Sequence, residues 1–371
     1  MNKRFAFILF TLAALLAFSR CAVRSDAADN YTFSWDISAE NHTGKSNDQY
    51  SKDRKHRGMS VFHWRQEDMN ESANQLIKNN IEWVAIIPFL YQRSDTTKIL
   101  RPSGKEGNWT RYDSVHIGAM KVMHDRGLHT MLKPHIWMSE GWRSDIELES
   151  DTEWDTWFDS YEEQMLHYAM LAEYTGAELF CIGTELRSSI INQPERWDQF
   201  ITNVKKIYGG KLCYAANWDG EYEKVKFWDR MDYIGLQAYF PLTDNASPSL
   251  MEIQDGWDQH IKLLEKLSKQ HNKPILFTET GYRSHNTATI RPWEWNNYEE
   301  IDSNSLSLTT QNLAYEALFR KLWHREWFAG VYFWQWHNTS KEGNTRESTD
   351  FTPRYKPAEN TMAKWYGKST K

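Results

Sequence analysis

Eight short apolar segments alternate with amphipathic segments between about residues 57 and 366, and this alternation restricts the possible folds more than any other feature. Each apolar segment is continuous instead of alternating with polar residues, which is typical of parallel strands buried on both faces. The predicted strands are Gly58–Phe62, Ile81–Phe89, His129–His135, Glu178–Gly183, Leu212–Ala216, Tyr233–Tyr239, Pro274–Phe277 and Ala329–Trp334.

Segments with helical spacing follow these strands. They are Asp68–Asn79, Tyr112–Arg126, Thr152–Tyr174, Pro194–Tyr208, Tyr222–Arg230, Leu250–Gln270, Leu308–Trp327 and Pro357–Trp365. Eight repeats in about 310 residues fit an α/β fold of the (β/α)₈ TIM-barrel type, in a single domain, better than an open doubly wound sheet. The sequence after the first strand lacks a glycine-rich phosphate-binding pattern, which argues against a dinucleotide-binding fold.

The chain before the barrel is predicted to direct export. Met1–Arg4 is basic and Phe5–Phe18 is a 14-residue apolar run, which is short for a membrane span and suited to a secretory signal. We expect residues 1–22 to be a signal peptide or lipoprotein leader, 23–53 a polar arm, and 54–371 the barrel. Cys21 could be lipidated and attach the protein to a membrane, although Arg20 precedes it where a small residue is usual. Ser25–Ala27 offers ordinary cleavage instead.

Charge and cysteine content exclude some partners. The net charge of −6, from 44 basic and 50 acidic residues, argues against nucleic acid held by phosphate contacts. Cys181 and Cys213 each lie in a predicted buried strand, where unpaired thiols are favoured over a geometrically awkward disulfide between strands. No cysteine and histidine residues have metal-ligand spacing, so the sequence predicts no metal site. No cofactor is expected either, because the chemistry considered below needs none.

Two glutamates follow buried strands in similar local sequences. Gly183-Thr-Glu185-Leu ends the fourth strand, and Phe277-Thr-Glu279-Thr-Gly281 ends the seventh, 94 positions later. TIM barrels place their chemistry at the C-terminal ends of the strands. The fourth and seventh strands lie across the barrel mouth from each other, so the two carboxylates can flank a bond held between them.

A carboxylate pair of this kind is suited to glycosidic bond cleavage. One carboxyl protonates the leaving oxygen, and the other supports an oxocarbenium-like centre. For either glutamate alone, a structural salt bridge to Arg187 or Arg283 is an equally good explanation. Both glutamates together, on the fourth and seventh strands, favour the catalytic interpretation. The chain also has 19 Trp, 18 Tyr and 17 Phe residues, and some of these flat rings are expected to line a sugar-binding groove.

These motifs, with Arg57-Gly-Met-Ser60 at the start and Asp350-Phe-Thr-Pro-Arg-Tyr-Lys-Pro-Ala358 near the end, resemble glycoside hydrolase family 113. The resemblance covers about residues 57–366. It implies a retaining β-mannanase in the large (β/α)₈ clan of glycosidases, with Glu185 as general acid/base and Glu279 as nucleophile. Many members of the wider clan have Asn before the acid/base, where it contacts the sugar 2-hydroxyl. This chain has Thr184, so that contact must come from elsewhere.

Other residues at the strand ends are candidates for substrate binding. Lys133 and His135 share a face of the third strand, where lysine would lower a carboxylate pKa and histidine could donate to a sugar hydroxyl; structural ion pairs are the alternative. Tyr239 could orient the nucleophile or simply pack in the core. Trp334 and Trp336 share a face by alternation, but a bend at the strand end could leave only one in the cleft. The further candidates are Asn217 and Trp218.

The favoured function is therefore that of an exported, monomeric retaining hydrolase of β-1,4-mannosidic bonds, in mannan, glucomannan or manno-oligosaccharides. Its expected location is the periplasm, the cell surface or the medium. The alternatives are an exo-β-mannosidase, a β-glucanase, or a non-catalytic surface lipoprotein that binds glycans. A pure binding protein would have no need of an acid/base pair.

Overall fold

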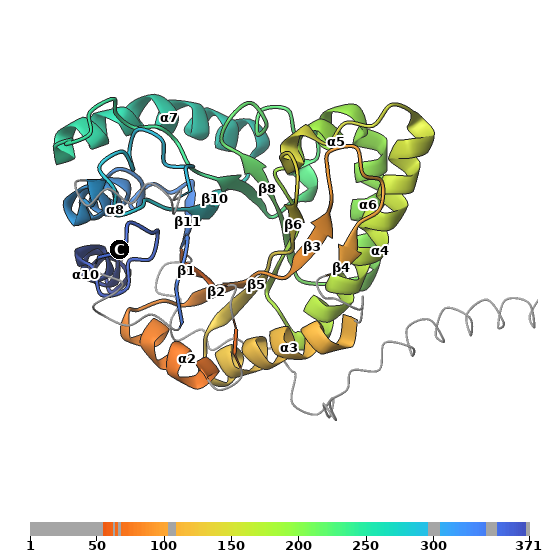
Figure 1. Ribbon diagram of the computed structural model, residues 1–371, viewed down its shortest axis with the longest axis horizontal. Helices are drawn as coiled ribbons and strands as arrows, with labels where there is room; N and C mark the ends of the chain where they lie inside the picture. Colours follow the sequence, from red (N-terminus) through yellow and green to blue (C-terminus); the bar gives the residue numbers. More distant parts are fainter. Residues whose placement is uncertain are drawn as a thin grey trace, which may run out of the picture.

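The computed structural model describes residues 55–61, 64–65, 68–102, 109–295, 305–338 and 347–368. Its centre is a closed barrel of eight parallel strands, with helices packed around the outside (Figure 1). Neighbours around the barrel follow the order β1-β11-β10-β9-β8-β7-β5-β2. The strands are β1 (His56–Val61), β2 (Trp83–Ile86), β5 (His129–Leu132), β7 (Leu179–Thr184), β8 (Lys211–Asn217), β9 (Tyr233–Gln237), β10 (Ile275–Thr280) and β11 (Phe328–Phe333). The predicted (β/α)₈ fold is confirmed.

Helices cover the barrel in the predicted order, with two differences: one predicted helix does not form, and the short helix α5 (Arg187–Asn192) was not predicted. They are α2 (Met69–Lys78), α3 (Trp109–Asp125), α4 (Asp151–Thr175), α5 (Arg187–Asn192), α6 (Pro194–Ile207), α7 (Leu250–His271), α8 (Leu308–Leu322) and α10 (Pro357–Tyr366). The helix predicted at Tyr222–Arg230 is wrong. That segment forms turns and the short 3₁₀ helix η5 (Trp228–Arg230), because its buried side chains fold the backbone back on itself, with Trp228 Nε1 donating to the Tyr222 carbonyl at 3.0 Å.

Local sequence signals explain where the long helices begin and end. The side chain of Ser249 accepts a hydrogen bond from Glu252 N, and Glu252 bonds back to Ser249 N, which is the reciprocal capping box at the start of α7. The side chain of Ser150 similarly caps α4, and Gly176 ends that helix at φ 71°, a left-handed conformation that glycine adopts without strain.

Two prolines divide strands that were predicted to be continuous. The predicted strand Ile81–Phe89 separates into β2 and β3 (Phe89–Gln92), and His129–His135 separates into β5 and the start of β6 (His135–Met138). The divisions fall at Pro88 and Pro134, which have no N–H group to donate to a sheet. His135 consequently belongs to β6 and not to the third barrel strand.

The strands β3 and β6 form a separate three-stranded sheet, together with β4 (Arg101–Pro102). One face of this sheet is buried: Leu90 and Ile136 join the main core, and Gln92 accepts a hydrogen bond from Trp157 Nε1 of α4 at 2.9 Å. The opposite face carries aromatic rings. Phe89 lies 5.8 Å from Trp137 and 5.9 Å from His135, measured between ring centroids.

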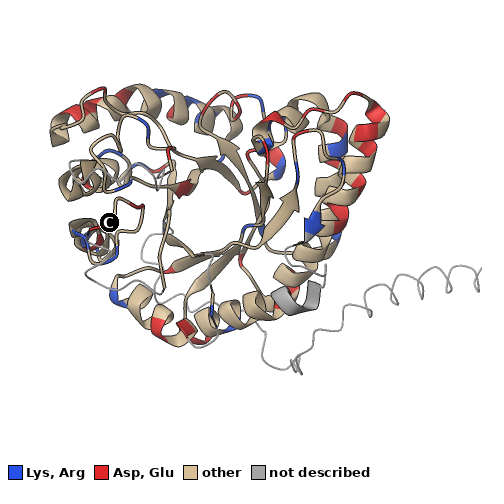
Figure 2. Cartoon of the chain, viewed as in Figure 1, with Lys and Arg blue, Asp and Glu red and all other residues tan. Residues whose placement is uncertain are grey.

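The core has two layers. The larger joins outward-facing strand residues such as Phe180 and Tyr214 to the helices. The smaller fills the barrel and includes Cys181 and Cys213, which are register partners on β7 and β8 and are both free thiols, as predicted. Acidic and basic residues are interspersed along the outer helices (Figure 2).

The predicted leader (1–22) and polar arm (23–53) lie outside the described residues. Within the part of the chain that the structure describes, no helix has the length and apolar character needed to cross a membrane.

Candidate active site

Glu185 and Glu279 lie together at the C-terminal end of the barrel. Glu185 directly follows β7, and Glu279 is the second-last residue of β10, two residues beyond the predicted end of that strand. Both side chains are buried, and Glu279 is close enough for its charge to raise the pKa of Glu185. The arginines considered as structural partners bind elsewhere: Arg187 pairs with Asp145 and Arg283 with Glu294.

Three donors surround the Glu279 carboxylate. Lys133 Nζ and Gln237 Nε2 donate to Oε2 at 2.8 and 2.9 Å, and the Tyr239 hydroxyl donates to Oε1 at 2.6 Å. Burial alone would raise the pKa of Glu279. The charge of Lys133 and the hydrogen bonds from these three residues outweigh burial and hold the pKa below its usual value. The site therefore favours an ionised Glu279.

Glu185 has different surroundings. Arg143, from the 3₁₀ helix η4 (Arg143–Asp145), forms an ion pair with its Oε2, and Asn217 Nδ2 donates to Oε1 at 2.7 Å. Burial is the largest influence and raises the pKa of Glu185; the charge of Arg143 opposes it and the charge of Glu279 adds to it. The net shift is upward, so the proton is held more tightly than on an ordinary glutamate. The two carboxyls thus have pKa values shifted in opposite directions, as an acid and a nucleophile require.

The backbone of Glu185 is left-handed, at φ 54°, which is unusual for a residue with a side chain. Three hydrogen bonds clamp this conformation. Glu185 N donates to the Ala215 carbonyl at 2.9 Å, Ser144 Oγ donates to the Glu185 carbonyl at 2.9 Å, and Leu186 N donates to the Tyr214 hydroxyl at 2.8 Å. These bonds hold the strained conformation and aim the carboxyl.

The two residues before Glu185, Gly183 and Thr184, are both packed against other residues of the barrel and its helices. A Cβ on Gly183 would lie 2.9 Å from Trp197, Tyr161 and Tyr214, so only glycine fits. Thr184 Oγ1 lies 3.9 Å from Cys181 Sγ, in the barrel interior. The amide beside Glu185 comes instead from Asn217, at the end of the neighbouring strand β8.

His135 and Trp334 form an aromatic wall beside Glu279. Their rings are nearly parallel, 6.2 Å apart, and His135 Nε2 lies 3.8 Å from Glu279 Oε2. Burial, followed by the charges of Lys133 and Arg143, lowers the pKa of His135 well below its usual value, which favours the neutral imidazole. Lys133, which directly follows β5, and His135, at the start of β6, thus both reach Glu279 from the two sides of Pro134.

Trp336 is placed apart from this wall. Trp334 belongs to the cluster inside the barrel, whereas Trp336 belongs to the outer core, where Arg354 lies 5.5 Å from its ring. The strand alternation predicted for the pair ends with β11 at Phe333. Trp334 N donates to the Thr280 carbonyl on β10, whereas Trp336 N donates to the Ser60 carbonyl on β1. In a regular strand, residues two apart bond to the same neighbouring strand, so the regular pattern does not continue through this pair.

Four exposed tryptophans lie near the residues that surround the two glutamates: Trp137, Trp142, Trp293 and Trp295. Trp137 contacts Phe89, and Trp295 contacts Trp334 at 5.9 Å, on the Glu279 side. On the Glu185 side the guanidinium of Arg143 lies 4.3 Å from the Trp142 ring. Trp218, which follows Asn217, stacks on Trp293 at 5.2 Å. Trp137, Trp142, Trp293 and Trp295 are 42% to 56% exposed, whereas Trp218 is half-buried, so the four exposed tryptophans offer flat surfaces for stacking on a ligand.

Sequence reasoning missed three residues of this site. Gln237 lies within the predicted strand Tyr233–Tyr239, where its side chain gives no sign of a role. Arg143 lies in η4, and Glu221, which accepts a hydrogen bond from Asn217 N at 2.7 Å, lies in the turn after β8. Charged residues are common in such connecting segments, and no periodicity indicates which of them will turn inward. Within the described residues, no group of three or more His, Cys, Asp or Glu side chains is arranged to hold a metal ion.

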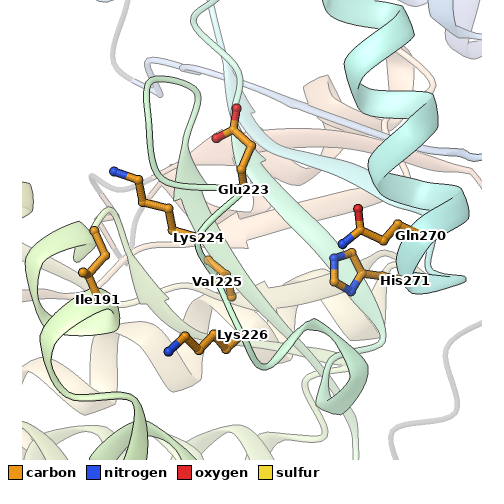
Figure 3. A pocket seen from close by; sticks show the side chains of 7 residues that line it. All are labelled: Ile191, Glu223, Lys224, Val225, Lys226, Gln270 and His271. Carbon is orange, nitrogen blue, oxygen red and sulfur yellow. The ribbon is translucent and has the colours of Figure 1, made fainter.

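A hollow of about 520 Å³ lies on the flank of the barrel, between the end of α5, the loop after β8 and the end of α7 (Figure 3). Its lining includes Ile191, Glu223, Lys224 and His271. The hydrogen-bond partners described above for Glu185 and Glu279 are not among its lining residues, so the hollow is separate from the glutamate pair.

Comparison with known proteins shows which family the chain is similar to. The model of Glycoside Hydrolase Family 113 matches residues 57–365. The solved complex of a family 113 β-1,4-mannanase is 25% identical, with 84% of this chain and 98% of that one covered at a TM-score of 0.73. The family 113 β-mannanase from Alicyclobacillus acidocaldarius is 26% identical, with 84% and 97% covered and the same TM-score.

More distant structures share the fold alone. A family 5 mannosidase from Rhizomucor miehei is 13% identical, with 85% of this chain and 94% of that one covered at a TM-score of 0.58. Comparison with curated protein sequences returns no match.

Proposed function

The chain belongs to glycoside hydrolase family 113, and from this premise we propose that it cleaves β-1,4-mannosidic bonds in mannan, glucomannan or manno-oligosaccharides by double displacement. The observation that carries the proposal is the contrast between two adjacent buried carboxyls. Glu279 has three donors and a lowered pKa, whereas Glu185 has a raised pKa. The mannanases described above, similar over most of their length, support the choice of sugar.

The proposed roles follow from these environments. Glu279 attacks the anomeric carbon and forms a covalent glycosyl-enzyme, while Glu185 donates its proton to the leaving oxygen. Glu185 then removes a proton from water, which attacks the same carbon and releases Glu279. Tyr239 and Lys133 hold the nucleophile, and Asn217 is the residue best placed to supply the sugar contact that Thr184 does not make.

The experiment that tests the proposal is product analysis. Purified protein is incubated with β-mannan, glucomannan and β-1,4-glucan, reducing ends are measured, and the anomeric configuration of the first product is followed by NMR. We expect release from the mannans with retention of configuration. Release only from glucan would support the β-glucanase alternative, release of mannose alone the exo-β-mannosidase, and calorimetric binding without turnover the glycan-binding lipoprotein. First products with the inverted configuration would contradict double displacement.

Substitution of Lys133 by methionine should shift the acidic limb of the pH profile upward by about one to three pH units. The Lys133 charge holds the pKa of Glu279 down, so its loss raises that pKa, and activity disappears as the pH falls through the new value. The measurement is kcat/KM against pH. Lys262→Met, on the exposed face of α7, is the control and should keep the original limb. An unmoved limb in Lys133→Met would show that Lys133 does not set this pKa.

We also propose that the protein is exported through its first 22 residues. The basic start and the apolar run support a signal, and Cys21 supports lipid attachment. Mass spectrometry of the mature amino terminus separates the two modes: a diacylated Cys21 indicates an anchored lipoprotein, and cleavage near Ala27 indicates an unanchored protein. An intact Met1 in the mature protein would contradict export by this route.

A further inference from the structure

A third carboxyl group lies buried close to Glu185. Glu221, in the loop after β8, is fully buried. The Tyr214 hydroxyl donates to its Oε1, and Asn217 N donates to its Oε2 at 2.7 Å. Burial raises the pKa of Glu221 to about 8, against the two hydrogen bonds, with the charge of Glu185 adding to the rise and that of Arg187 opposing it. A carboxyl buried this completely, and sharing a hydrogen-bond partner with Glu185, is a candidate for a role in the site.

Both partners of Glu221 also hold Glu185. Asn217 uses its backbone N–H for Glu221 and its side-chain amide for the Glu185 carboxyl, at 2.7 Å in each case. The Tyr214 hydroxyl donates to Glu221 and accepts from Leu186 N, the peptide group that follows Glu185. Glu221 is therefore connected to Glu185 in two ways: through Asn217, which bonds the Glu185 side chain, and through Tyr214, which bonds the peptide group after Glu185.

We propose that Glu221 is a positioning residue for the acid/base: it fixes Asn217 and Tyr214, and through them the carboxyl direction and left-handed backbone of Glu185. This inference rests on the proposed function. Left-handed backbone in a residue with a side chain persists only where the surroundings determine it. A small rotation of Glu185 would move its proton away from the leaving oxygen, and proton transfer requires hydrogen-bonding distance.

The proposal predicts an effect that depends on the leaving group. Glu221→Gln keeps the size and shape, but its Nε2 cannot accept a hydrogen bond, so one of the two contacts is lost. With mannan or manno-oligosaccharides, whose leaving sugar must be protonated, kcat should fall roughly tenfold or more, as part of the total contribution of a general acid. With a dinitrophenyl β-mannoside, whose leaving group departs without a proton, formation of the glycosyl-enzyme should change less than about twofold, because that step does not use the acid.

Two companion variants complete the experiment. Tyr214→Phe removes the hydroxyl on the second path and should show the same dependence on the leaving group. Glu223→Gln alters an exposed glutamate two residues along the same loop and should leave the rates on both substrates unchanged. A thermal unfolding curve for each variant shows whether that variant is folded under the conditions of the rate measurements.

The outcomes are distinct. An equal loss on both substrates in Glu221→Gln would show that the residue only supports the fold, and an unchanged rate on mannan would show that it has no role; either overturns the inference. A wild-type protein that hydrolyses other β-glycosides but not mannan overturns the proposed substrate instead. The leaving-group comparison then proceeds with aryl and oligomeric glycosides of the sugar that is hydrolysed.

Discussion

Glu279→Ala is expected to reduce turnover of mannan by at least about a thousandfold, since the variant lacks the nucleophile and with it the covalent intermediate. The measurement is reducing-end release at high enzyme concentration. Added azide should restore part of the rate, because the small anion occupies the space left by the carboxylate and attacks the anomeric carbon directly. The product of that attack has the inverted α configuration.

The stereochemistry makes this result diagnostic. An α-glycosyl azide identifies Glu279 as the group that attacks the sugar, whereas simple loss of activity would also follow from a damaged fold. Glu265→Ala, on the outer helix α7, is a matched control that should keep full activity. Substantial residual turnover in Glu279→Ala, or a β-glycosyl azide, would assign the nucleophile to another residue.

Glu185→Ala should produce the complementary pattern. We expect kcat/KM on mannan to fall about 10²- to 10⁴-fold, the usual contribution of a general acid. An activated aryl β-mannoside should still form the glycosyl-enzyme, whose hydrolysis is then slow because the general base is missing. Azide should accelerate this second step and give a β-glycosyl azide, the configuration opposite to that from Glu279→Ala.

The pH profile gives an independent readout for Glu185. The wild-type rate should fall at low pH as Glu279 becomes protonated, and at high pH as Glu185 loses its proton. The pKa shifts place these limbs below and above the ordinary value for glutamate. Because Glu185→Ala has no acid to lose, its basic limb on the activated substrate should disappear. A basic limb that persists there would show that another group titrates.

The barrel strands could be predicted because burial on both faces leaves a continuous apolar run in the sequence. Glu185 and Glu279 could be identified because a charged residue directly after such a run lies at the barrel mouth. The identification of strands from continuous runs failed at Pro88 and Pro134, since each of these prolines lies inside a segment that resembles one uninterrupted strand. The additional sheet of β3, β4 and β6 depends on those two interruptions.

Arg143 and Glu221 were harder to predict than the partners at strand ends, because they come from the segments that connect the strands and helices. Arg143 lies 42 positions before Glu185, and Glu221 lies 36 positions after it. Their approach depends on how η4 and the turn after β8 fold over the barrel. Hydrophobic periodicity carries no information on such turns, so a loop arginine or glutamate in the sequence has no feature that separates it from a solvated one.

The left-handed backbone at Glu185 also has a consequence for how this protein could be studied. A side chain at positive φ costs about 1 kcal/mol relative to glycine, so Glu185→Gly should be more stable than Glu185→Ala, by ~2 °C in melting temperature. Both lack the acid. The glycine variant is therefore the better form in which to trap and crystallise intact substrate. Catalysis requires a glutamate at this position, whereas stability favours a glycine, so a variant that need not be active can carry the more stable residue.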